Sequence, residues 1–403
     1  MAVQEYPAPE AVSRLQTRAF GVGIIALLLA LYGAVRSPQT FFASYLMSFL
    51  LVLGITLGSL GLVMLQHLTS GHWGIIIRRP LESATRTLPL LAIAFLPIAI
   101  FGMKYLYNGG NGNDKGWLNA PASGEGALSA FQKSWLTHNG YLIRAVIYFA
   151  VWLFLMFIFN IWSKQQDTNK TDRALRQRFK LLAGPGIILY VFVMGFASVD
   201  WVMSISPHWA STIYGFIFVG GQLISSMAFM IAVVVMLART EPFSGILQPR
   251  HLHDLGKLLL AFVMLWAYFD FSQLLIIWSG NQPEEISFYR TRLYGEWGVV
   301  AVIVVIFHFF VPFFLLLSQD LKRRAQIISK IAMWLILMRL VDLYWTTRPE
   351  FTSSAVPSWL DLVLPIALGG LWLGFFAFNL KQCPLLPVGD PKLEEAIEQH
   401  HEH

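Results

Sequence analysis

The chain has 403 residues, of which 56% are hydrophobic and only 13% are charged, and its mean hydropathy is +0.58. Soluble domains carry about a quarter charged residues, so this composition excludes an ordinary soluble domain and is typical of a polytopic membrane protein. The formal charge of +6 does not indicate nucleic-acid binding, because the basic residues lie in short loops beside apolar segments, where they set membrane topology.

Ten apolar segments are each long enough to cross a bilayer as a helix, which takes about 20 residues. In chain order they span 18–35, 41–67, 86–107, 141–163, 181–204, 209–239, 256–279, 296–319, 327–345 and 358–381. Strands are not expected, because an open sheet cannot satisfy its backbone in lipid. We therefore expect an all-α fold of ten transmembrane helices, arranged as two four-helix bundles plus two peripheral helices. Residues 1–403 then form a single integral membrane domain, with a short N-terminal segment 1–17 and a tail 382–403.

Lysine and arginine are distributed unevenly between the two sides of the membrane that these segments define. Twenty of the 29, including Arg78, Arg79 and Arg86, lie on the side that holds both chain ends, and eight lie on the other. Cytoplasmic loops carry the excess of basic residues, so both termini are expected in the cytoplasm. The first apolar run follows Arg14 and Arg18 and is expected to remain as a membrane helix, not to be cleaved as a signal peptide.

Two polar stretches of the chain allow a structural or a binding interpretation. The basic run 170–180 (KTDRALRQRFK) precedes the fifth segment, and we interpret it as a topology determinant near anionic headgroups, not as a specific lipid site. The tail from Lys392 is expected to be a short helix or disordered. Its closing histidines resemble metal ligands, but a frayed polar terminus is the favoured interpretation.

No redox cofactor is expected on this chain. The single cysteine, Cys383, excludes an intrachain disulfide, a c-type haem motif and a cysteine-ligated iron–sulfur cluster. A membrane-embedded b-type haem would need two facing histidines, and only His308 lies deep in an apolar segment. The sequence contains no P-loop, Rossmann glycine signature or HExxH motif, so ATP-driven transport and hydrolytic catalysis are not supported.

Ionisable side chains within or beside the apolar segments are the candidate functional residues, because a charge in hydrocarbon costs from a few to more than ten kcal/mol. We expect them at staggered depths between the middle of the membrane and its outer face. A proton path is predicted to use Asp200, Asp270, His308, Arg339, Asp342 and Glu296, with polar support from Tyr268, Gln273, Gln222 and Ser225.

Asp270 is the strongest of these candidates. Its surroundings, WAYFDFSQ, contain no cation, so its carboxylate must find a partner on another helix or hold a proton. Arg339 and Asp342 are three residues apart and can pair on one helix face, which leaves open a purely structural, mutually neutralised pair.

The other candidates keep a structural alternative. Asp200 lies near the interface, where a capping or anchoring role competes evenly with proton transfer. His308 could be a structural hydrogen-bond donor, although its ordinary titration range also suits a proton relay. Glu296 could simply be a solvated charge at a helix start, where the helix dipole favours it.

One segment carries a sequence motif that is more specific than the apolar composition of the chain. Residues 198–215, SVDWVMSISPHWASTIYG, join the fifth and sixth segments through a short outer turn. This stretch resembles the hallmark of the NrfD/PsrC-like membrane subunits of alternative complex III, a bacterial quinol:cytochrome c oxidoreductase, whose pattern is roughly S-x-D-W-x-M-S-L-E-P-H-W-x-S-T-I-Y-G. It departs from that pattern at Ile205-Ser206, where the family often has Leu-Glu. Further matches are the blocks 268–278, 295–298 and 308–324 and the R-x-x-D pair of the ninth segment.

The resemblance covers most of the chain and is strongest to the smaller of the two ten-helix subunits of that complex. It implies a subunit of the bacterial cytoplasmic (inner) membrane without its own redox centre, which conducts protons and binds or flanks a quinol such as menaquinol. Expected partners are a larger homologous quinol-oxidising subunit, an iron–sulfur subunit, multihaem cytochrome c subunits and lipids. The haem c groups and iron–sulfur clusters would belong to those partners. The family's functional positions would correspond to Asp200, Asp270, His308, Arg339 and Asp342.

Two other functions remain open from the sequence. A stand-alone proton-coupled secondary transporter is one, and a purely structural membrane anchor for peripheral redox subunits is the other. Transporters often have broken helices at corresponding positions of two repeats. The prolines within the segments show no such pairing; they are Pro89, Pro97, Pro312 and Pro365.

Overall fold

The computed structural model describes residues 6–109, 116–121, 127–168, 173–390 and 393. Within these residues the chain forms helices and no strand. The basic run is described from residue 173 onward. Apart from Leu393, the tail from Lys392 with its histidines lies outside the described residues.

Nine helical stretches of the described chain are long and apolar enough to cross a membrane. Seven of them are single helices: α1 (Glu10–Arg36), α2 (Pro38–Thr69), α7 (His138–Thr168), α8 (Arg173–Trp201), α9 (Tyr214–Leu237), α10 (Pro249–Gly280) and α16 (Trp359–Leu380). The other two are composite. One consists of α3 (Arg78–Thr85), α4 (Leu88–Pro97) and α5 (Met103–Leu106), and the other of α12 (Gly295–Val304) and α13 (Val311–Leu317). The chain is therefore a helical protein of multi-pass membrane type.

A further long helix, α15 (Ala325–Thr347), is embedded among them. It packs along α9 and also contacts α12. It is less apolar than its neighbours because it carries Lys330, Arg339 and Asp342 within 23 residues. This helix corresponds to the ninth segment expected from the sequence.

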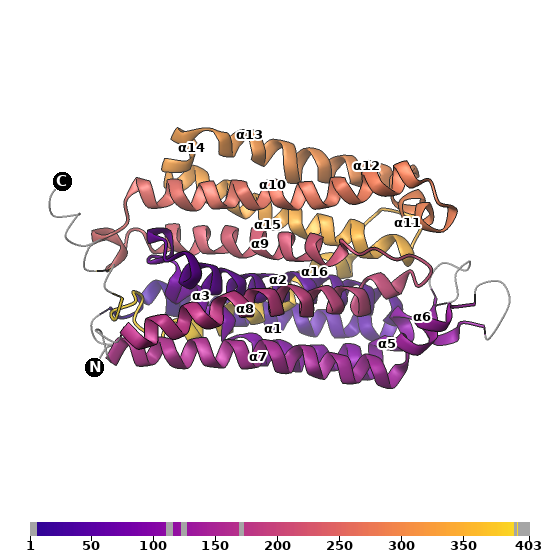
Figure 1. Cartoon of the computed structure of the whole chain (residues 1–403), viewed down its shortest axis with the longest axis horizontal. Coiled ribbons are helices and arrows are strands. Elements are labelled where there is room, and N and C mark those ends of the chain that lie inside the picture. The colour runs from indigo at the N-terminus through magenta and orange to yellow at the C-terminus, as the bar shows by residue number, and fades with distance from the viewer. Residues whose placement is uncertain (1–5, 110–115, 122–126, 169–172, 391–392, 394–403) are drawn as a thin grey trace.

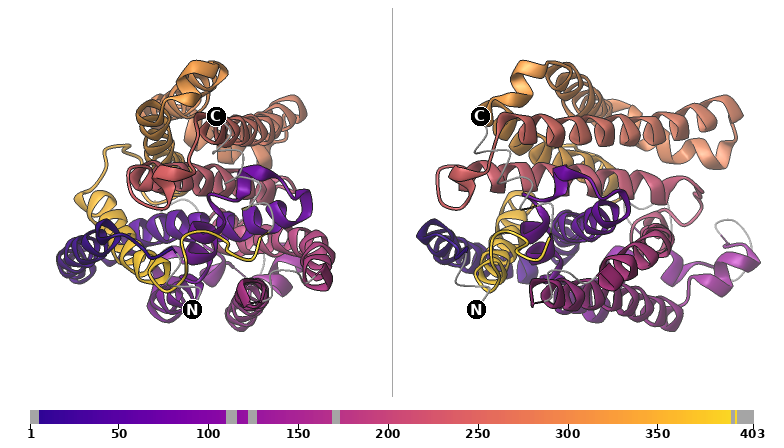
Figure 2. Two further views of the ribbon diagram at one scale, coloured as in Figure 1. Left: turned by 90° about the vertical axis from the view of Figure 1, so that its left-hand side faces the viewer. Right: turned by 60° about the vertical axis from the view of Figure 1, so that its left-hand side comes forward.

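Two central helices form the core of the bundle. The apolar stretch of α2 is buried along its whole length and that of α9 is 83% buried, and the two helices pack against each other. Helices α10, α12–α13 and α15 surround α9 on one side, and α3–α5, α7 and α8 lie around α2 on the other (Figures 1 and 2). Helices α1 and α16 pair outside these two groups.

Small residues allow α1 and α16 to cross closely. A Cβ at Gly370 would lie 2.8 Å from the Cα of Gly23. Membrane helices commonly use small residues in this way, because close backbone approach replaces the hydrophobic driving force that is absent in lipid. The opposite face of α1 is exposed and apolar, with Ile25 and Leu28 each 63% exposed.

Both ends of the described chain lie at one end of the bundle (Figure 1). The backbone N–H of Leu385 donates to the carbonyl of Tyr6 at 3.0 Å. Two short helices, α6 (Ala130–Trp135) and α11 (Pro283–Leu293), lie at the opposite end. The sixth segment was expected to begin at residue 209, but α9 begins at Tyr214 because residues 206–213 form the turn that follows α8.

Candidate functional site

His308 lies where its helix widens locally. Val305–Phe310 forms a π-helical turn between α12 and α13. Pro312 has no N–H, and its ring crowds the carbonyl four residues earlier, so the regular helical bond to His308 cannot form. The π turn accommodates this defect, and such turns are frequent at functional sites. The His308 ring is fully buried and stacks on the Trp266 indole of α10 with 4.3 Å between ring centres, and neither ring nitrogen has a partner among the described residues.

Two adjacent glycines of α9 let two other helices approach. A Cβ at Gly220 would lie 3.2 Å from the Cα of Trp266 on α10, and a Cβ at Gly221 would overlap the guanidinium of Arg339 on α15. The Arg339 guanidinium donates to the carboxylate of Asp342, and both residues are only 4% exposed. The pairing expected from their three-residue spacing is therefore present, and Gly221 provides the space for it.

A small cavity brings Asp270 next to this ion pair. The cavity lies among α9, α10, α11 and α15, and Asp270, Arg339 and Asp342 all line it. Its volume of about 20 Å³ is enough for roughly one water molecule. The partly buried Asp270 carboxylate forms no hydrogen bond or ion pair with any described residue. Among the described residues that line the cavity, the cation is Arg339, and it is already paired with Asp342.

Uncharged polar groups face the same cavity. The Trp209 indole and the Tyr214 hydroxyl line it, and each is buried without a hydrogen-bond partner among the described residues. Tyr289 of α11 also lines it; burial raises the pKa of Tyr289, and the Asp270 carboxylate raises it further, so its hydroxyl stays protonated. Buried polar groups in proteins are normally satisfied by protein or ordered water. The cavity thus presents hydrogen-bond donors beside two carboxylates.

Asp200 lies outside this cavity and is held in place by four hydrogen bonds. Its fully buried carboxylate accepts from the Trp135 indole at 2.8 Å and the Tyr148 hydroxyl at 2.7 Å. The Arg144 guanidinium donates to it twice, at 2.7 and 2.9 Å. These contacts join α6, α7 and α8. This geometry fits the anchoring role that the sequence left open for Asp200, and Asp200 does not line the cavity that holds Asp270.

The predicted path residue Glu296 and the predicted supporting residue Tyr268 also lie outside the cavity. Glu296 is exposed and accepts from the Ser354 hydroxyl at 3.0 Å and the Ala355 N–H at 2.8 Å, so it fixes the loop before α16. Tyr268 is 65% exposed on α10 and does not line the cavity. The sequence pattern gives the depth of such residues but not the direction in which each side chain points.

The predicted amide and hydroxyl groups divide between the cavity and helix packing. Gln273 lines the cavity and accepts from the Ser211 hydroxyl at 2.6 Å. Gln222 accepts from the Tyr190 hydroxyl at 2.6 Å and so joins α8 to α9. Ser225 donates to a carbonyl of its own helix at 2.8 Å. Only Gln273 belongs to the cavity.

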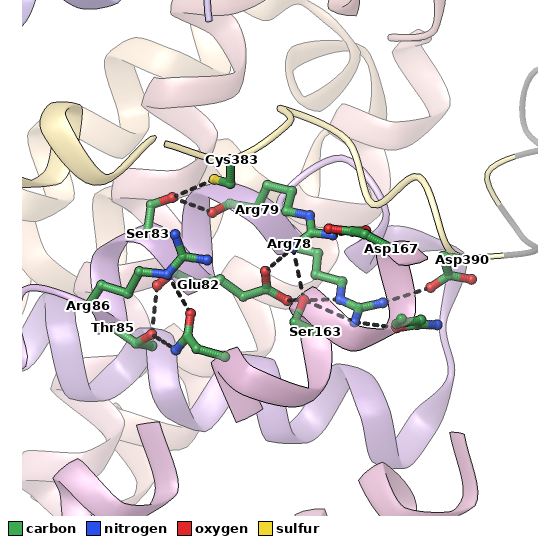
Figure 3. Close-up of polar contacts among 12 residues, drawn as sticks. Arg78, Arg79, Glu82, Ser83, Thr85, Arg86, Ser163, Asp167, Cys383 and Asp390 are labelled. Atoms are coloured by element: carbon green, nitrogen blue, oxygen red, sulfur yellow. Dashed lines mark hydrogen bonds and ion pairs between the residues drawn. The ribbon is translucent and has the colours of Figure 1, made fainter. Parts of the chain in front are cut away.

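A buried polar network at the other end of the bundle was not predicted (Figure 3). Arg78 and Arg79 donate to the two oxygens of Glu82 at 3.0 and 2.8 Å, and the Ser163 hydroxyl donates to the same carboxylate at 2.7 Å. Both arginines and Glu82 are 1% exposed. The sequence interpretation counted Arg78 and Arg79 only as topology signals. Their spacing of four and three residues from Glu82 was the available sign of helical ion pairs.

The network also connects distant parts of the chain. Arg78 donates to Asp390 at 3.1 Å and to Gln166 at 2.6 Å, and Arg79 pairs with Asp167. These contacts tie α3 to the end of α7 and to the segment after α16 (Figure 3). The network is therefore a buried connection between three segments, at the end of the bundle that holds both chain ends.

No group of three or more His, Cys, Asp or Glu side chains in the described part of the chain is arranged to hold a metal ion. Comparison with known proteins adds no relative, since no protein-family model and no curated protein matches the chain.

The close fit at Gly221 makes a testable prediction. Gly221→Ala is expected to displace the Arg339 guanidinium and lower the free energy of unfolding by about 1–3 kcal/mol, as overpacking typically does. Thermal unfolding in detergent measures the effect. Gly369→Ala is the matched control, because a Cβ at Gly369 meets no atom within 4 Å. Equal stability of the two variants would show that Arg339 does not depend on the space at Gly221.

Proposed function

We propose that this chain is a proton-conducting membrane subunit of a respiratory quinol:acceptor oxidoreductase of the alternative complex III type. In this proposal it has ten membrane spans, with α15 as the ninth, and both termini lie in the cytoplasm of a bacterium. It binds no redox cofactor itself. Iron–sulfur and multihaem cytochrome c subunits carry the electrons, and a larger homologous subunit oxidises the quinol.

The observation that carries the proton role is the cavity shared by Asp270 and the Arg339–Asp342 pair. Intramembrane ionisable residues are costly and usually functional. Asp270 has no hydrogen bond or ion pair within the described chain, unlike Asp200, so its protonation is not tied to a fixed partner. The cavity has room for about one water molecule beside the donors of Trp209 and Tyr214. A carboxylate that can exchange its proton with such a water is a proton carrier.

The proposed path is shorter than the one expected from the sequence. Its proton-carrying groups are Asp270 and Asp342, with Arg339 beside them and the His308 ring stacked on Trp266 in the same helical group. Because Arg339 is a permanent cation, it favours the ionised form of the two carboxylates and does not itself carry the proton.

The respiratory role is supported by the resemblance of residues 198–215 to the alternative complex III subunits. That segment supplies Trp209 and Tyr214 to the cavity wall, so the stretch that carries the resemblance also contributes to the site. An apolar cavity of about 600 Å³ lies against α6, α8 and α9, with Phe192 and Phe216 exposed beside it and Ser211 at its edge. Its apolar lining with few polar groups suits a quinone ring.

Isolation of the chain from its native membranes in mild detergent tests this proposal. We expect it to co-purify in fixed proportion with proteins that carry haem c and iron–sulfur clusters, seen by optical and electron paramagnetic resonance spectra. A monodisperse single polypeptide that carries out proton-coupled transport in liposomes would contradict the proposal and support the secondary transporter.

A further inference from the structure

A second polar cavity lies at the end of the bundle that holds both chain ends. Its volume is about 500 Å³, and it is formed by the end of α2, the start of α3, the end of α7 and the first turns of α8. It adjoins the buried network around Glu82 and shares Arg78 with it. The polar and charged side chains that line it include Gln66, His67, Arg78, Gln166, Arg176, Lys180 and the carboxylate of Asp390, which pairs with Arg78.

Two positive charges that line the cavity have no neutralising partner among the residues that the structure describes. Arg78 is occupied, because it donates to Glu82, Asp390 and Gln166. Arg176 and Lys180 form no ion pair or hydrogen bond with any described residue. They are four residues apart on one face of α8, where like charges repel and weaken the helix. An anion between them would remove this repulsion.

Buried polar atoms of α2 face the same space. His67 is 9% exposed and Gln66 is 4% exposed, and both line the cavity. The Nε2 atom of His67 and the Oε1 atom of Gln66 have no hydrogen-bond partner among the described residues. The His67 ring is held by stacking on Phe179, with ring centres 4.0 Å apart and planes within 7°. A fixed imidazole beside two cations is a suitable donor for a phosphate oxygen.

Exposed apolar residues continue directly from the cavity along the helices. Leu68 follows His67 and is 45% exposed, and Leu181 follows Lys180 and is 68% exposed. About two turns further along α8, Ile188 is 60% exposed. The two cations therefore lie where an apolar outer surface begins, which is the depth of lipid headgroups.

We propose that this cavity binds the phosphodiester group of an anionic phospholipid in the leaflet on the side of both chain ends. Arg176 and Lys180 neutralise the phosphate, His67 donates from Nε2, and the acyl chains extend along Leu181 and Ile188. Basic pockets between membrane helices bind anionic headgroups by this chemistry. Arg176 and Lys180 of the basic run thus contribute a lipid site as well as a topology signal, independently of the proton path.

Native mass spectrometry of the purified protein with its partners, in phosphatidylcholine nanodiscs titrated with phosphatidylglycerol, tests the site. We expect the double variant Arg176→Gln/Lys180→Gln to bind phosphatidylglycerol on the order of thirtyfold more weakly, since each cation near a headgroup contributes several-fold. The matched control Lys164→Gln/Arg178→Gln removes two exposed charges at the same end but outside the cavity, and is expected to retain affinity within about twofold. His67→Phe keeps the stacking and is expected to weaken binding by about fivefold.

Two results would overturn the proposal. Equal phosphatidylglycerol affinity of the wild-type protein and the Arg176→Gln/Lys180→Gln variant would show that these cations do not hold the lipid. Displacement of the bound phosphatidylglycerol by low millimolar inorganic phosphate would assign the cavity to a soluble anion. Circular dichroism of each variant establishes that it is folded before its affinity is compared.

Discussion

Replacing Glu82 by glutamine is expected to lower the free energy of unfolding by about 3–5 kcal/mol. The Glu82 carboxylate is 1% exposed and accepts hydrogen bonds from Arg78, Arg79 and Ser163. Glutamine keeps the shape of the side chain but carries no charge, so two buried guanidinium groups lose the carboxylate between them. Removing one partner of a buried ion pair is costly because the remaining charge stays desolvated. Denaturant titration in detergent micelles, followed by circular dichroism, measures the loss.

An exposed ion pair provides the control for this substitution. Asp254 and Lys257 are joined at 3.0 Å, but their side chains are 46% and 56% exposed. Asp254→Asn is therefore expected to change the free energy of unfolding by no more than about 1 kcal/mol. If Glu82→Gln and Asp254→Asn lowered the free energy of unfolding by similar amounts, burial of the network would not contribute to stability, contrary to the role described above.

The helices were predictable from the sequence because lipid imposes a strict rule on the backbone. Every N–H and C=O in the membrane must be satisfied, so each long apolar segment becomes a helix. Interruptions were harder to predict. Helix α11 lies in a stretch with Glu285 and Arg290 that resembles a polar loop, and the turn at 206–213 lies partly in a segment that composition assigns to a helix.

The contacts of the candidate site were predictable only where the residues involved are close together in the sequence. The three-residue spacing of Arg339 and Asp342 predicts their pairing, whereas the π turn at His308 was not predicted. The surroundings of Asp200 do not follow in this way. Its carboxylate binds Arg144 and Trp135, which are 56 and 65 positions away in the chain, so the packing of helices decides whether it is a proton carrier or an anchor.

The burial of Arg78 and Arg79 was not predicted from the sequence. Counting basic residues assigns both to the cytoplasmic side as topology signals, and that rule considers neither burial nor partners. In the structure both are buried because Glu82, Asp167 and Asp390 surround them. Two of these carboxylates come from segments far along the chain, so the network could not be read from local spacing alone.

If the chain has the proposed function, replacing Asp270 by asparagine is expected to abolish proton translocation while the proposed complex still assembles and transfers electrons. Asparagine has nearly the same shape, so the cavity with Arg339 and Asp342 is preserved, but the amide cannot take up and release a proton. Asp270→Glu retains the carboxyl group and is expected to keep a measurable part of the activity. Tyr268→Phe, on the exposed side of the same helix, is expected to behave like the wild-type protein.

The decisive measurement is the number of protons released per electron by the proposed complex, in sealed proteoliposomes that are supplied with quinol. It is compared between the wild-type protein and Asp270→Asn. The proposed path predicts that the translocated protons disappear in the variant and that only those released by quinol chemistry remain, at an unchanged rate of electron transfer. An unchanged proton-to-electron ratio in Asp270→Asn would contradict proton conduction through this cavity and would leave the chain a structural anchor.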